Sequence, residues 1–174
     1  SEPLVSDEDI LSAGGIILAG NDIRAHLEGC THVVFMAATL SIQTDMLISR
    51  TQTRNIGDAH ILDALAGAGI EQICGKAEFL IKEQFPEKYM TWRYSAGYGD
   101  FPIELQSELA AYLDAQRKIG LTVTETSLMI PKKSVTAVIG IADKPLPQKR
   151  SGCTSCNMRD ICNFRRNGVH CGNA

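Results

Sequence analysis

The chain has 174 residues, of which 44% are hydrophobic and 21% charged, enough for one globular domain with a core plus an appendage. No apolar run reaches the ~20 residues that a membrane-spanning helix needs. The net charge of −3 combines a basic segment after Lys144 with an acidic remainder. That segment is nearly without the aromatics that stack on bases, so we expect no nucleic-acid partner. The absence of a long apolar run leads us to expect no membrane partner. The first residues lack the pattern of an export signal, which predicts a cytoplasmic location.

Residues 1–20 contain Gly14, Gly15 and Gly20, and we predict an irregular or short helical lead-in there. Asn21 is a suitable N-cap for a short helix over residues 22–28. Residues 31–39 then form a compact apolar run with β-branched side chains, which is typical of a buried strand.

Two helices are predicted next. The first covers residues 42–50, with Ile42, Met46 and Ile48 as the candidates for its inward face. The second is capped by Asn55 and runs to about Phe85, because its apolar residues repeat with a period near 3.6. The inward residues expected on this helix are Ile61, Leu62, Leu65, Ile70, Ile73, Ala77, Leu80 and Ile81.

Residues 92–102 read WRYSAGYGDFP and predict a loop. A helix over residues 103–118, ended by Gly120, and two strands over 121–130 and 134–142 follow. The pattern as a whole predicts an α+β fold with a mostly antiparallel sheet and packed helices.

Four of the six cysteines lie close to the C-terminus, with the spacing Cys153-x2-Cys156-x5-Cys162-x8-Cys171. Four thiolates can hold an iron–sulfur cluster or a zinc ion. This spacing lacks the two equal C-x2-C knuckles of many zinc sites, which favours iron–sulfur over structural zinc. Disulfides or free thiols are the third alternative. We therefore expect one domain over residues 1–142, followed by a linker and a cluster-binding tail over 143–174.

The loop over residues 92–102 is the second candidate site. Arg93 offers a planar set of donors that suits a carboxylate. Gly97 and Gly99 let a ligand approach the main chain, and Tyr94 and Tyr98 offer flat apolar faces with a polar tip. Such a loop could hold a small zwitterion that carries an aromatic group, although an ordinary turn has a similar composition.

The stretch Arg93-Tyr94-Ser95-Ala96-Gly97-Tyr98, the segment IGLTVTETSLMIP over residues 119–131, and Ser134-Val135-Thr136 together resemble a known family. They are similar to the S-adenosylmethionine-binding activation domain of cobalamin-dependent methionine synthase. The resemblance is closer to the free-standing form of that domain, in which a cysteine tail like CTSCNMRDIC follows.

This resemblance implies a function. The family restores inactive cob(II)alamin to methylcobalamin with one electron and the methyl group of S-adenosylmethionine. The implied cofactor-binding residues are Arg93 on the methionyl carboxylate, Ser95 through its backbone, and Gly97 and Tyr98 around the adenosine. Ala96, between them, belongs to the same set. No catalytic side chain of the chain's own is expected.

The resemblance also implies cofactors and partners. A [4Fe–4S] cluster on Cys153, Cys156, Cys162 and Cys171 would supply the electron. Zinc is the alternative metal for these cysteines, and it would have a structural role only. The cobalamin would come from the cobalamin-binding domain of a separate methionine synthase or related corrinoid protein, and a low-potential donor would reduce the cluster.

Within this resemblance the chain departs from the family's pattern. Ala96 replaces a proline, and Gly67 stands where longer enzymes carry a glutamate. Glu71 lies one turn further along the helix and is a candidate replacement for that contact. Without the resemblance, a solvated helix face explains Glu71 and Glu78. The alternative functions are an iron–sulfur electron-transfer partner and a zinc-stabilised scaffold subunit, both without methyl chemistry.

Overall fold

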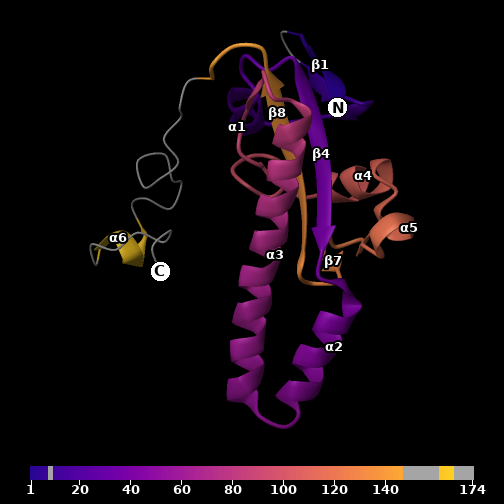
Figure 1. Ribbon diagram of the computed structural model, residues 1–174, viewed down its shortest axis with the longest axis vertical. Coiled ribbons are helices and arrows are strands. Elements are labelled where there is room, and N and C mark those ends of the chain that lie inside the picture. Colours follow the sequence, from indigo (N-terminus) through magenta and orange to yellow (C-terminus); the bar gives the residue numbers. More distant parts are fainter. Residues whose placement is uncertain (8–9, 147–160, 167–174) are drawn as a thin grey trace.

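The computed structural model describes residues 1–7, 10–146 and 161–166. These residues fold as an α+β protein, in which helices cover both faces of an antiparallel sheet (Figure 1). The predicted fold class is therefore confirmed. Within the described residues, no helix is both long and apolar enough to cross a bilayer.

The main sheet has six strands, and every pair of neighbours is antiparallel. Their order is β3 (Ile16–Ile17), β2 (Leu11–Ala13), β1 (Glu2–Ser6), β4 (His32–Thr39), β8 (Ser134–Ala142) and β5 (Tyr89–Met90). The two long central strands pair over the whole length of β4, from His32 opposite Ile141 to Thr39 opposite Ser134. Both strands were predicted, because a long apolar run is a local signal. A separate pair, β6 (Thr122–Val123) and β7 (Met129–Ile130), forms a small hairpin.

The described helices are α1 (Asn21–His26), α2 (Ser41–Gln52), α3 (Ile56–Gln84), α4 (Leu105–Tyr112), α5 (Ala115–Ile119) and α6 (Asn163–Arg166). Asn55 caps α3 as predicted. Its side-chain oxygen accepts the backbone N–H groups of Gly57 at 2.9 Å and Asp58 at 3.3 Å. Two N–H groups of the first turn, which have no partner within the helix, are satisfied in this way.

Alternate side chains of the central strands enter two separate cores, as strand geometry requires. Val33 and Phe35 of β4 point into the larger core, with α1 and α4. Met36 and Ala38 of the same strand point to the opposite face, where they pack against α3. Strand β8 therefore lies between the two cores and carries side chains into both.

The expectation of an irregular or helical start is wrong, because β1, β2 and β3 occupy that segment. Gly14 and Gly15 have φ angles of +57° and +81° and join β2 to β3. A two-residue turn with both φ angles positive matches the twist of antiparallel strands. The signal for the turn was present as Gly-Gly, but β2 and β3, with three and two residues, are too short to show a periodicity.

The chain between the loop and β8 also differs from the prediction. The helix expected over residues 103–118 is broken into α4 and α5 at Asp114, whose φ is +53°. Gly120 ends α5 with φ +69°, as predicted. The single strand expected over residues 121–130 is wrong. Thr124 accepts the N–H of Leu128 on its hydroxyl at 3.0 Å and so closes the tight turn between β6 and β7.

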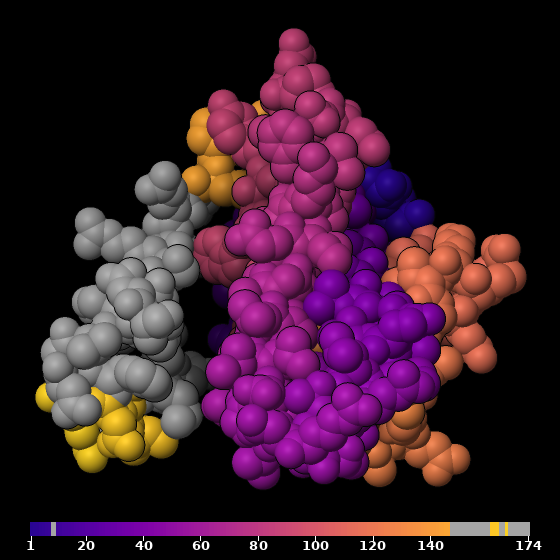
Figure 2. Space-filling model, turned by 60° about the horizontal axis from the view of Figure 1, so that its bottom comes forward, coloured from indigo at the N-terminus to yellow at the C-terminus, as the bar shows by residue number. Residues whose placement is uncertain are grey.

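Helices α2 and α3 extend beyond the end of the sheet as an antiparallel pair (Figure 1). Figure 2 shows this end of the molecule, with the two helices side by side. The prediction that Ile42 and Met46 point inward is wrong, because their side chains are 44% and 46% exposed and no residue of α2 is buried. The helices reach past the sheet that would have covered them.

The inward face of α3 was also misassigned in part. Ile70 is buried as predicted, but Ile61 and Leu65 are 59% and 62% exposed. The buried positions are Ala59, Ala66, Ile70 and Cys74. This face is rotated from the one predicted and its residues at the free end of the helix are small.

Candidate functional site

The loop over residues 92–102 starts beside the centre of the sheet. The N–H of Tyr94 donates to the carbonyl of Val138 at 2.9 Å, and the N–H of Val138 donates back to the carbonyl of Tyr94 at 2.8 Å. This isolated bridge fixes the loop against β8 directly after Arg93. The bridge therefore places Arg93 and Ser95, the residues on either side of Tyr94, next to β8.

The loop then folds into a compact turn. The N–H of Gly97 donates to the carbonyl of Phe101 at 2.8 Å, and the N–H of Phe101 donates to the carbonyl of Tyr98 at 3.0 Å. Gly97 and Gly99 have φ angles of +92° and +56°, which other residues adopt only at a cost. Phe101 is 1% exposed and anchors the turn in the larger core.

Asp100 joins this turn to helix α1, and we call the contact the Asp22–Asp100 latch. The Asp100 carboxylate accepts the backbone N–H groups of Asn21 at 2.7 Å and Asp22 at 2.9 Å. The Asp22 carboxylate in turn accepts the N–H of Asp100 at 3.1 Å. The predicted N-cap role of Asn21 is therefore wrong, because a residue of the loop caps α1. The hydrogen bonds from Asp22, and then from Asn21, hold the pKa of Asp100 below its ordinary value.

Arg93 forms ion pairs with two carboxylates of α3, and we call the three side chains the arginine triad. One terminal nitrogen of the guanidinium contacts Glu78 and the other contacts Glu71. The Arg93 side chain is 26% exposed and Glu78 is 28% exposed, whereas Glu71 is 60% exposed. The hydrogen bond that Arg93 donates to the Glu78 carboxylate is the main cause that raises the pKa of Arg93. The interpretation of Glu71 and Glu78 as a merely solvated face is wrong.

A cavity of about 460 Å³ opens beside the triad, and we call it the arginine cavity. It combines three charged groups with three aromatic side chains. Its lining residues are Glu71, Glu78, Trp92, Arg93, Tyr94, Ser95, Tyr98 and Val135. A site of this kind can bind a zwitterion, since Arg93 can pair with the ligand's carboxylate and the two glutamates can pair with its ammonium group.

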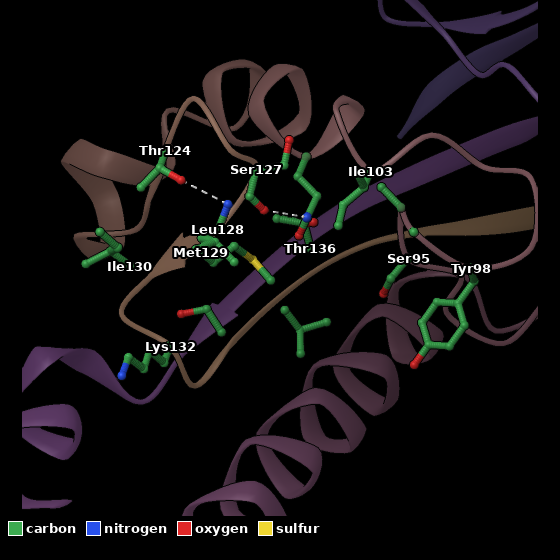
Figure 3. Close-up of a pocket in the computed structure, with 15 residues that line it drawn as sticks. Ser95, Tyr98, Ile103, Thr124, Ser127, Leu128, Met129, Ile130, Lys132 and Thr136 are labelled. Atoms are coloured by element: carbon green, nitrogen blue, oxygen red, sulfur yellow. Dashed lines mark hydrogen bonds between the residues drawn. The ribbon is translucent and has the colours of Figure 1, made fainter. Parts of the chain in front are cut away.

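A second cavity of about 680 Å³ lies between the loop and the β6–β7 hairpin, and we call it the hairpin cavity. Ser95 and Tyr98 stand on one side of it and residues 124–130 on the other (Figure 3). Most of the lining is apolar. The lining residues are Ser95, Ala96, Gly97, Tyr98, Ile103, Gln106, Thr124, Ser127, Leu128, Met129, Ile130, Lys132, Ser134, Val135 and Thr136. Its volume lies within the ~300–1,000 Å³ typical of small-molecule sites.

The two cavities share three lining residues, Ser95, Tyr98 and Val135. Tyr98 is 65% exposed. A ligand that spans both cavities would pass over this side chain, with its charged end at the arginine triad and its apolar end at the hairpin.

The turn before β8 is tied to the projecting helices. The N–H of Lys132 donates to the Asp45 carboxylate of α2 at 2.8 Å, and the ammonium of Lys133 lies 2.9 Å from the Asp63 carboxylate of α3. These contacts fix the edge of the hairpin cavity relative to α2 and α3. The acidic residues therefore have a positioning role that does not need a ligand.

Residues 72–145 match the model of the family described as vitamin B12 dependent methionine synthase, activation domain. The matched span is somewhat less than half of the chain, and it contains the whole loop, the β6–β7 hairpin and β8. It supports the activation-domain resemblance. Sequence comparison with curated proteins gives no match.

The structure brings the five predicted cofactor-binding residues together, but distributes them over the two neighbouring cavities. Arg93 faces the arginine cavity, and Ser95 and Tyr98 line both cavities. Ala96 and Gly97 line the hairpin cavity but not the arginine cavity. Ala96 is 8% exposed because it also packs into the larger core. Their binding roles remain predictions.

The predicted metal ligands fall mostly outside the described residues. Cys153, Cys156 and Cys171 lie outside them, and Cys162 is half-buried just before α6. Among residues 1–7, 10–146 and 161–166, no three His, Cys, Asp or Glu side chains are placed to share a metal ion. The cluster therefore stays a prediction from spacing.

Three features of the site were missed from the sequence. The common helix face of Glu71 and Glu78 was recognised from their spacing, but their shared partner Arg93 was not. The capping role of Asp100 had no local signal, because its partners are 78 and 79 residues away. The burial of Thr136 beside the hairpin cavity was likewise not visible in the sequence.

Proposed function

We propose that this chain reactivates a B12-dependent methionine synthase in the cytoplasm. The substrate is cob(II)alamin held by the cobalamin-binding domain of a separate methionine synthase or related corrinoid protein. One electron and the methyl group of S-adenosylmethionine convert it to methylcobalamin, and S-adenosylhomocysteine is left. The family match over residues 72–145 carries this proposal, because it covers the loop and the strand that build both cavities.

The arginine triad supports S-adenosylmethionine as the methyl donor. This molecule carries a carboxylate, an ammonium and a sulfonium group. Arg93 uses one contact from each terminal nitrogen for the glutamates, and a guanidinium has five N–H donors, so donors remain for a carboxylate. Glu71 is 60% exposed and provides an anionic partner for the ligand's ammonium or sulfonium. In this assignment Glu71 supplies the acidic contact for which Gly67 has no side chain.

The remaining loop residues would hold the rest of the ligand. Ser95 offers its backbone and Tyr98 its ring at the border of the two cavities. Gly97 permits the turn, since a residue with a side chain would be strained at its φ of +92°. Ala96 contributes a small wall that leaves room in the hairpin cavity.

The electron would come from an iron–sulfur cluster in the C-terminal segment. In this proposal residues 1–142 bind S-adenosylmethionine, and residues 143–174 form a linker and a tail. The four thiolates of Cys153, Cys156, Cys162 and Cys171 are the donor set that a [4Fe–4S] cluster needs, and such a cluster supplies a low-potential electron. A separate donor would reduce it.

The functional test is an anaerobic assay. The chain is mixed with a methionine synthase in the cob(II)alamin state, S-adenosylmethionine and a low-potential reductant, and methylcobalamin is followed by its absorbance. Arg93→Ala should abolish most of the reaction and weaken S-adenosylmethionine binding by about tenfold or more. Arg117→Ala is the matched control, because Arg117 is 75% exposed and pairs only with Asp114 among the described residues. Equal activity of both variants would remove Arg93 from the site.

The cluster has its own test. Anaerobically purified chain should contain about four iron and four sulfide ions. Cys156→Ser should lose iron and reactivation and keep S-adenosylmethionine binding. Zinc in place of iron would favour the scaffold alternative, and iron without S-adenosylmethionine binding would favour a plain electron-transfer partner.

A further inference from the structure

Helix α3 carries apolar side chains on two opposite sides. On one side Ile61 and Leu65 are 59% and 62% exposed, and Figure 2 shows α3 running along the surface of the molecule beside α2. The other side is the buried one described above, with Ala59, Ala66, Ile70 and Cys74. A surface helix normally has one apolar face and one polar face, so the second apolar face of α3 indicates a second contact.

The exposed side of α3 forms a continuous stripe, which we call the outer stripe. With about 3.6 residues per turn, its members lie on one face of the helix at intervals of three and four residues. This is the spacing of helices that pair along their length. The stripe is about 27 Å long, because each residue adds about 1.5 Å. Its members are Asp58, Ile61, Leu65, Ala68, Gln72 and Lys76, and all six are exposed.

The middle of the outer stripe has little side-chain volume. Residues 64–69 read ALAGAG, so Leu65 is the one large side chain there. A Cβ built on Gly67 has no atom within 4 Å, and one on Gly69 would make only ordinary contact with Leu40, at 3.5 Å. Packing within the described residues therefore does not require these glycines. Small residues do let a second helix approach closely, and a large side chain of that helix can fill the space above them.

Opposite charges stand at the two ends of the outer stripe. Asp58 and Lys76 are 18 residues apart, which is five full helical turns, so both side chains leave the same face of α3. Among the described residues neither of them has an ion-pair partner. Gly67 lies midway between them. Two α3 helices that pack antiparallel about Gly67 therefore bring Asp58 of each beside Lys76 of the other, and the stripe is complementary to itself in this orientation.

We propose that two copies of this chain pair through the outer stripe of α3, antiparallel and about a twofold axis near Gly67. The same surface is then used on both copies, as a twofold interface requires. Leu65 of each copy lies against the small residues around Ala68 of the other. Glu71 and Glu78 are on a different face of α3, where they contact Arg93, so pairing leaves the arginine triad intact.

The first test is sedimentation equilibrium of the full chain. Wild-type chain should form a dimer that dissociates on dilution. Leu65→Glu places a charge at the centre of the interface and should raise the dissociation constant about a hundredfold. Ile17→Glu is the matched control, because Ile17 is 57% exposed but lies on β3, outside the stripe. Circular dichroism of all variants separates lost pairing from lost folding.

The second test exchanges the charges. Asp58→Lys and Lys76→Asp each place like charges opposite one another, so each variant alone should pair about tenfold more weakly. An equimolar mixture of the two variants should recover wild-type affinity, because both contacts between unlike chains are then attractive. A mixture that pairs as weakly as either variant would overturn the antiparallel arrangement.

Two further results would overturn the inference as a whole. One is a wild-type chain that stays monomeric at every concentration, and the other is a Leu65→Glu variant that dimerises as wild type does. If the monomeric chain binds the corrinoid protein and Leu65→Glu weakens that binding, the outer stripe belongs to that partner and not to a second copy.

Discussion

Gly99 provides a direct test of the Asp22–Asp100 latch. Its φ is +56°, and a Cβ built there would lie 2.0 Å from Oδ2 of Asp22. In Gly99→Ala the left-handed backbone costs about 1–2 kcal/mol. The carboxylate must also move away from the N–H of Asp100, which it accepts at 3.1 Å, and overpacking of this kind costs about 1–3 kcal/mol. The expected loss of unfolding free energy is therefore about 2–5 kcal/mol.

Gly120→Ala separates the two contributions. Gly120 has φ +69° and no atom within 4 Å of a built Cβ, so this variant should lose only the backbone part, about 1–2 kcal/mol. Urea unfolding can be followed by the fluorescence of Trp92, the single tryptophan, which lies at the start of the loop. Equal losses in the two variants would show that Asp22 moves without cost, and the latch would then have no energetic role.

Leu109 is 0% exposed, so Leu109→Ala should lower the free energy of unfolding by about 2–5 kcal/mol, as measured by thermal unfolding. Leu128 is 64% exposed, so Leu128→Ala should change this free energy by no more than about 0.5 kcal/mol. Asp100→Ala should be less stable than wild type at neutral pH. The backbone N–H groups of Asp22 and Asn21 lower the folded-state pKa of Asp100, so this difference in stability should be fully present above about pH 4 and should shrink as the pH falls further. A difference that does not shrink in acid would contradict the latch. Burial raises the pKa of Cys30 to about 11, so site-resolved mass spectrometry at pH 8 should find its alkylation on the order of a hundredfold slower than in urea; equal rates would refute this.

Local patterns predicted the parts of the fold that depend on neighbours in sequence. Strands β4 and β8 are continuous apolar runs, and Asn55 stands directly before the helix that it caps. Strands β2 and β3 were missed because three and two residues give no measurable period, and the five residues of β1 do not alternate cleanly between buried and exposed. The buried face of α2 was also mispredicted, since Ile42 and Met46 are 44% and 46% exposed.

The composition of the site was predictable, but its geometry was not. The loop residues 92–102 carry an arginine, aromatics and glycines that favour a binding site on their own. Their partners are set by the fold: α3 supplies both carboxylates to Arg93 from 15 and 22 residues away. The β6–β7 hairpin is held by α4, through the bond from Gln106 to Ser127, while the loop is held by β8, and no local signal encodes that the two then face one cavity.

The charge of the arginine triad should favour the methyl donor over the product at the proposed site. Glu71 and Glu78 together outweigh Arg93 by one negative charge. S-adenosylmethionine has a net charge of about +1 at neutral pH and S-adenosylhomocysteine about zero, because methyl transfer removes the sulfonium. The triad should therefore bind the methyl donor more tightly than the product and so help the product to leave. Glu71→Gln should narrow this difference in affinity, as measured by calorimetry with both compounds. An unchanged ratio would mean that the triad acts only on the ligand's amino-acid end, which the two compounds share.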